Sequence, residues 1–155
     1  MDAGSKRKGL AERIAEEHAA IRGALEEIRA EVDRLRAEAG PEHGAGRLPA
    51  LLRDFDQHLR RHFELEEEGG FFGEWTGLDP GKHRRVERLL AQHRSLERGV
   101  SALVDGASRA EARRAPLSEA FVSGLRKLLA DLLRHEKAEN ELAQELALQD
   151  TGGGD

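Results

Sequence analysis

The chain has 155 residues, of which 38% are apolar and 35% are charged, and its formal net charge is −5 at pH 7. This length suits one domain, and the mixed charges with an acidic excess argue against a nucleic-acid groove. The absence of cysteine and tyrosine excludes disulfides, thiolate metal ligands, a thiol nucleophile and tyrosyl-radical chemistry.

The composition favours long helices, because the chain is rich in Ala, Leu, Glu and Arg and has only four prolines. Breaks rich in Gly or Pro separate four helical segments, which are predicted at residues 8–39, 48–68, 80–105 and 117–148. Because the links are short, we predict an all-α, antiparallel up-down four-helix bundle. We expect one domain over residues 1–150 and a disordered tail over 151–155.

The first predicted helix has one apolar stripe, in which the spacing alternates between three and four residues. The stripe consists of Leu10, Ile14, His18, Ile21, Leu25, Ile28, Val32 and Leu35. His18 is its only polar member. In the second predicted helix, His62 and Glu66 continue an apolar stripe that begins at Leu48.

The third and fourth predicted helices repeat this feature. His93 lies on the apolar stripe of the third helix, and Glu97 lies at the edge of that stripe. In the fourth helix, His135 and Glu139 occupy two successive stripe positions that would otherwise hold leucine. Each helix therefore places a histidine on its buried face, and two helices add a glutamate four residues later.

Two residues four apart on a helix share one face, so a His-x-x-x-Glu pair directs an imidazole and a carboxylate at one spot. Burying such groups without partners costs roughly 1–3 kcal/mol each, and more for an ionised carboxylate. Metal ions would remove this cost, since imidazole suits iron, zinc or copper and carboxylates can bridge two cations. The predicted ligands of a two-metal site are His18, His62, Glu66, His93, His135 and Glu139.

Two further residues are candidates for this site. His58 precedes His62 by one turn and could be a fifth nitrogen ligand, a proton relay or a partly exposed residue outside the coordination. Glu97 could be a ligand, a proton relay or a residue at the rim. The aromatic residues Phe71, Phe72 and Trp75 are predicted to seal the bundle end next to Glu66.

The four motifs together resemble those of the hemerythrin-like, or HHE cation-binding, family, in particular its bacterial non-haem di-iron members. The resemblance covers about residues 10–148 and rests on "EEHAAI" (His18), "HFELEEE" (His62, Glu66), "AQHRSLE" (His93) and "RHEKAE" (His135, Glu139). It implies a four-helix bundle with these six residues as ligands. It also implies a centre of two iron ions with an oxo, hydroxo or solvent bridge.

The resemblance further implies binding of, or reaction with, O2, NO or peroxide, in oxidative or nitrosative stress or in iron handling. One alternative is a catalase-like enzyme that decomposes peroxide, and another is an iron-storing or metal-responsive interaction module with structural metal. Whether the protein is an enzyme stays open. Four residues after His93 the chain has Glu97, where oxygen-carrying members have a second histidine, so a pure oxygen carrier is disfavoured. Without a signal core or a long apolar run, we expect a cytoplasmic protein with no membrane or nucleic-acid partner.

Overall fold

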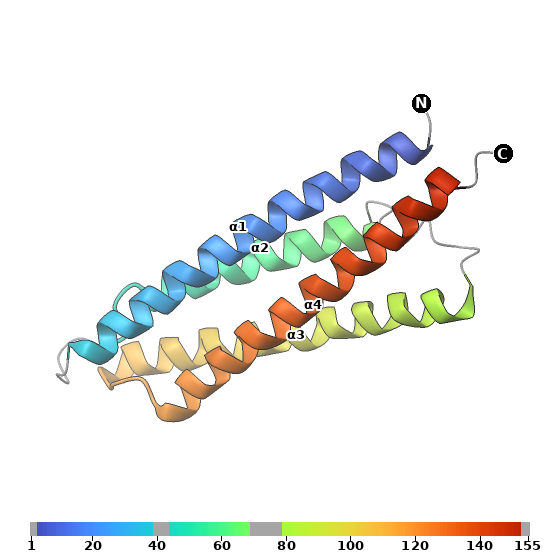
Figure 1. The fold of residues 1–155 in the computed structure, drawn as a ribbon. Helices are drawn as coiled ribbons and strands as arrows, with labels where there is room; N and C mark the ends of the chain where they lie inside the picture. The colour runs from blue at the N-terminus through green and yellow to red at the C-terminus, as the bar shows by residue number, and fades with distance from the viewer. Residues whose placement is uncertain (1–2, 39–43, 69–78, 153–155) are drawn as a thin grey trace.

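The computed structural model describes residues 3–38, 44–68 and 79–152, and within them every regular element is an α-helix. The helices are α1 (Ala3–Ala37), α2 (Leu48–Glu68), α3 (Pro80–Arg113) and α4 (Glu119–Gly152). Successive helices run in opposite directions, so the two ends of the chain lie at the same end of the bundle (Figure 1). Contacts join α1 to α2, α2 to α3, α3 to α4 and α4 back to α1. The predicted all-α antiparallel bundle is confirmed.

The helix boundaries follow from local sequence. Asp79 caps α3 through a side-chain oxygen that accepts a hydrogen bond from the backbone N–H of Lys82, and Pro80 occupies the first turn. The predicted end of α3 at residue 105 is wrong, because the helix continues past Gly106 through good helix formers. It ends where Arg114 adopts a left-handed conformation, with φ 48° and ψ 42°, two residues before Pro116.

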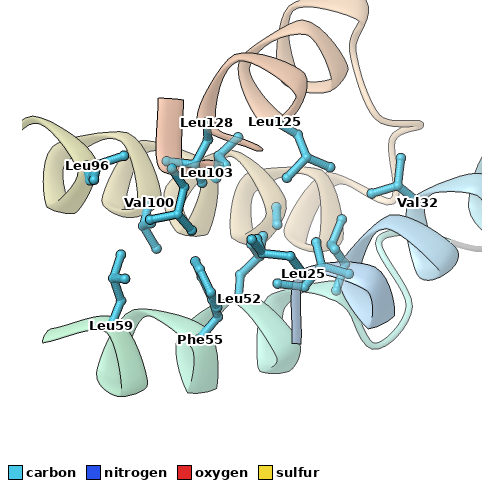
Figure 2. Packing of buried hydrophobic residues seen from close by; sticks show 14 of the residues in the cluster. Leu25, Val32, Leu52, Phe55, Leu59, Leu96, Val100, Leu103, Leu125 and Leu128 are labelled. Atoms are coloured by element: carbon cyan, nitrogen blue, oxygen red, sulfur yellow. The ribbon is translucent and has the colours of Figure 1, made fainter. Parts of the chain in front are cut away.

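The core has two apolar clusters that a layer of His and Glu residues separates along the bundle axis. The larger cluster contains residues from all four helices, and Figure 2 shows how they pack around Leu52, Phe55 and Val100. The smaller cluster lies nearer the ends of the chain and consists of Ile14, Val86, Leu89, Leu142 and Leu146, from α1, α3 and α4. The polar layer is thus enclosed on both sides by apolar packing.

Two of the expectations concern chain segments at the margins of the fold. α2 ends two residues after Glu66, and the predicted aromatic seal of Phe71, Phe72 and Trp75 falls outside the described residues. α4 continues to Gly152, so the first two residues of the predicted tail are helical. In the part of the chain that the structure describes, no helix has the length and apolar character needed to cross a membrane.

Candidate metal centre

The six predicted ligands all lie in the polar layer between the two apolar clusters. Each is almost completely buried, with 0–3% of its surface exposed: His18, His62, Glu66, His93, His135 and Glu139. The stripe pattern explains this placement. In α4, for example, Leu132 belongs to the larger cluster and Leu142 to the smaller one, and the two polar residues lie between them.

Within this layer the potential ligand atoms form two groups, in each of which all four atoms lie within 4.8 Å of one another. The first group is His18, His62, Glu66 and Glu139, and the second is Glu66, His93, His135 and Glu139. Both groups contain the same two carboxylates. The geometry therefore offers two adjacent positions for a cation, each with two imidazoles and a share of both carboxylates.

Glu139 is contacted by histidines from three helices. Its Oε2 lies 3.1 Å from Nε2 of His18, and its Oε1 lies 3.2 Å from Nε2 of His93. Nε2 of His135, one turn earlier on α4, contacts the same Oε1. The carboxylate thus joins α1, α3 and α4 at one point.

Glu66 also lies among imidazoles, but its carboxylate oxygens have fewer hydrogen-bond partners than those of Glu139. Nε2 of His62 contacts its Oε1, and Nε2 of His93 lies 3.6 Å from its Oε2. Among the residues that the structure describes, no group makes a hydrogen bond of ordinary geometry to either oxygen of Glu66. A fully buried carboxylate in this condition is costly unless it is neutral or coordinates a cation.

The surroundings shift the pKa values of the two carboxyl groups in opposite directions. Burial, followed by the negative charge of Glu139, raises the pKa of Glu66 well above its usual value. Burial would also raise the pKa of Glu139, but hydrogen bonds from His135, His18 and His93 outweigh it and hold that pKa well below the usual value. Without metal, the surroundings therefore favour the protonated form of Glu66 and the ionised form of Glu139.

Burial also lowers the pKa of His62 and of His93, so both imidazoles are neutral near pH 7. Neutral imidazole is the form that binds a metal ion. A set of four inward imidazole nitrogens and two carboxylates is suited to iron, zinc or manganese, and cations would satisfy the unpaired oxygens of Glu66. The residues present therefore fit a two-metal centre.

The outer nitrogens of two imidazoles have specific acceptors on neighbouring helices. Nδ1–H of His62 donates to Oε2 of Glu17 at 2.5 Å, and Nδ1–H of His135 donates to the side-chain oxygen of Gln92 at 2.8 Å. These contacts hold both rings with Nε2 turned inward, as a metal ligand requires. Sequence reasoning missed both acceptors. The sequence indicates them only by their position, since Glu17 directly precedes His18 and Gln92 directly precedes His93.

His58 and Glu97, the two additional candidates, belong to neither group of potential ligands. Both are half-buried. Glu97 forms ion pairs with Arg94 at 3.2 Å and with Arg60 at 3.6 Å, which hold it at the α2–α3 surface. The structure therefore brings together the six main candidates and leaves these two outside.

Comparison with known proteins gives one match. The model of the Hemerythrin HHE cation binding domain matches residues 9–147, which is most of the chain and includes all six candidate ligands. No curated protein and no solved structure matches the chain. The family resemblance read from the four motifs is confirmed.

Proposed function

The chain belongs to the hemerythrin HHE cation-binding family, and on that premise we propose that it is a non-haem di-iron protein that binds O2, NO or peroxide. The process it serves would be the response to oxidative or nitrosative stress, or iron handling. The observation that carries the proposal is the pair of buried four-residue groups that share Glu66 and Glu139. Two shared carboxylates are the ligands that a pair of cations needs in order to be held side by side.

The protein would position the metal ions and exclude bulk water from them. His18, His62, Glu66 and Glu139 would hold one iron ion, and the second group would hold the other. The apolar clusters on both sides exclude bulk water from the layer, which strengthens every electrostatic interaction inside it. Iron, when bound with positions left open, supplies reversible binding and one-electron chemistry for small oxygen and nitrogen species.

Peroxide turnover is the second candidate, and one contact favours it. Repeated turnover requires a route for protons between the centre and solvent. Glu17 accepts a hydrogen bond from His62 and is itself about one-third exposed, with 34% of its side-chain surface accessible. Glu17 therefore replaces Glu97 and His58 as the most direct candidate for such a route.

The deciding experiment is metal analysis of the purified chain, with optical spectra recorded before and after addition of NO, O2 and peroxide. We expect about two iron ions per chain and a spectrum that changes with at least one of the three molecules. Catalytic consumption of many equivalents of peroxide would favour the enzyme. A folded, metal-free protein without affinity for iron would refute the proposal.

A structural metal would give a different outcome in the same experiment. In that case removal of the metal should unfold the bundle, and NO, O2 and peroxide should leave the spectrum unchanged. The double variant Glu66→Gln/Glu139→Gln should lose two-ion binding, because both groups of candidate ligands contain the same two carboxylates.

A further inference from the structure

The two cation positions have the same kinds of inner donors, two imidazoles and two shared carboxylates, but different outer neighbours. We call the position beside His18 and His62 the α1/α2 position, and the position beside His93 and His135 the α3/α4 position. Both share Glu66 and Glu139, so the inner donors do not distinguish them. The groups behind the imidazoles, in contrast, differ between the two positions.

A carboxylate lies behind one imidazole of the α1/α2 position. The Oε2 atom of Glu17 accepts the 2.5 Å hydrogen bond from His62. Glu136 is 3% exposed and interacts electrostatically with His18. In the part of the chain that the structure describes, Oε1 of Glu136 and Nδ1 of His18 both have no hydrogen-bond partner. Glu136 also interacts electrostatically with His135 of the other position, so Glu17 is the outer acceptor that distinguishes the α1/α2 position.

The outer acceptor of His135 at the α3/α4 position is Gln92, whose amide oxygen carries no formal charge. Nδ1 of His93 lies 3.9 Å from Oε1 of Glu67, and that same oxygen accepts a hydrogen bond from Arg94 at 2.8 Å. Arg94 offsets the charge of Glu67. The electrostatic contrast between the two positions is therefore built from Glu17 on one side and Gln92 on the other.

An acceptor behind a ligating imidazole increases the donor strength of the inward nitrogen, and a carboxylate does so more than an amide. Its negative charge also attracts the cation through a medium of low dielectric constant. Loss of such an outer partner typically lowers metal affinity by about 10–100-fold.

We infer that the two metal positions are inequivalent, and that the α1/α2 position, backed by Glu17, takes up the first divalent cation more tightly than the α3/α4 position, backed by Gln92. The inference rests on the proposed two-metal function. It adds an order of loading, with the second ion as the one that exchanges.

The experiment adds Co²⁺ stepwise to the metal-free full chain and records heat and visible absorption. We expect two binding steps whose affinities differ by about 10-fold or more. Glu17→Gln, which keeps the shape of the side chain and removes its charge, should weaken the first step by about 10-fold and leave the second nearly unchanged. Gln92→Glu should instead strengthen the second binding step, so that the affinities of the two steps become more similar.

The control is Glu16→Gln, which removes the same charge from the exposed neighbouring position on α1 and should leave both steps unchanged. Circular dichroism confirms that each variant is folded. A single step in the unmodified chain, or an equal effect of Glu17→Gln on both steps, would overturn the inference while leaving the two-metal site intact. Absence of Co²⁺ and Fe²⁺ binding altogether would instead refute the proposed function and the inference with it.

Discussion

The ring of Phe63 lies parallel to the imidazole of His93, with centroids 3.9 Å apart and an angle of 8° between the planes. The same ring meets His135 edge-on at 5.8 Å and lies 5.9 Å from its sequence neighbour His62. One apolar side chain on α2 therefore contacts imidazoles on α2, α3 and α4. It forms the boundary between the larger apolar cluster and the polar layer.

Replacing Phe63 should damage both stability and metal binding. Phe63→Ala is expected to lower the free energy of unfolding by about 3–5 kcal/mol, as truncation of a buried phenylalanine does, and to loosen the imidazoles that rest on the ring. The matched control is Phe55→Ala, which truncates an equally buried phenylalanine two turns earlier on α2 and away from the layer. Urea unfolding and metal analysis should show similar losses of stability but a loss of metal only for Phe63→Ala. Equal metal content in the two variants would contradict the role assigned to Phe63.

Replacing each of two helical glycines with alanine should have different effects on stability. A Cβ atom at Gly23 in α1 would meet no heavy atom within 4 Å, whereas one at Gly106 in α3 would lie 3.1 Å from Cδ2 of Phe121. Gly23→Ala should therefore raise the free energy of unfolding by about 0.5–1 kcal/mol, the usual gain inside a helix. Gly106→Ala should gain less or lose stability, because the ring of Phe121 must shift. Denaturant unfolding of both variants provides the measurement, and a larger gain at Gly106 would be inconsistent with this close approach of α3 and α4.

The positions of the candidate ligands could be predicted because helical periodicity decides which face of a helix is buried. His18 and Glu139 are 121 residues apart in the chain, yet each interrupts an apolar stripe, and both stripes must face the same core. No alignment of the helices was needed to see that the polar interruptions require partners. Burial alone makes these polar groups costly unless they bind a metal ion.

The outer contacts could not be predicted in this way. Whether Glu17 reaches His62 depends on how far α1 is rotated relative to α2, and periodicity leaves that rotation undetermined to within the width of a stripe. The end of α3 was also misjudged, because a single glycine costs only about 1 kcal/mol in a helix that is otherwise well packed. Gly106 is tolerated where it brings α3 close to Phe121.

The metal-free protein should lose stability on acidification below about pH 6.5. Burial lowers the pKa of His62 and His93 from the ordinary value of 6.5, so below that pH the unfolded chain binds protons that the folded chain does not. Each such proton makes the free energy of unfolding fall by up to about 1.4 kcal/mol per pH unit. Urea unfolding between pH 5 and 8, in the presence of a chelator, tests this. A stability that is constant from pH 8 to pH 5 in the Glu66→Gln variant, which removes the opposing proton uptake of Glu66, would contradict the neutral, buried state of these imidazoles.

Glutamine at the two shared carboxylate positions should have unequal effects in the metal-free protein. Because burial favours the protonated, neutral form of Glu66, Glu66→Gln should change stability by roughly 1 kcal/mol or less. Glu139→Gln removes the charge that holds His18 and His93 at 3.1 and 3.2 Å, and should lower stability by about 1–3 kcal/mol. Chelator-treated samples unfolded in urea at pH 7 give both values.

The pH dependence of the same two variants separates the carboxylates further. A raised pKa means that folded Glu66 keeps a proton above pH 4.5 that the unfolded chain has lost, so Glu66 makes stability fall as pH rises and opposes the effect of the histidines. Glu66→Gln should therefore make the loss of stability between about pH 6.5 and 4.5 steeper. The lowered pKa of Glu139 gives the reverse sign, since its contribution is present above pH 4.5 and is lost as the pH falls through the folded value. If Glu66→Gln destabilised the metal-free protein as much as Glu139→Gln at pH 7, the proton would not reside on Glu66.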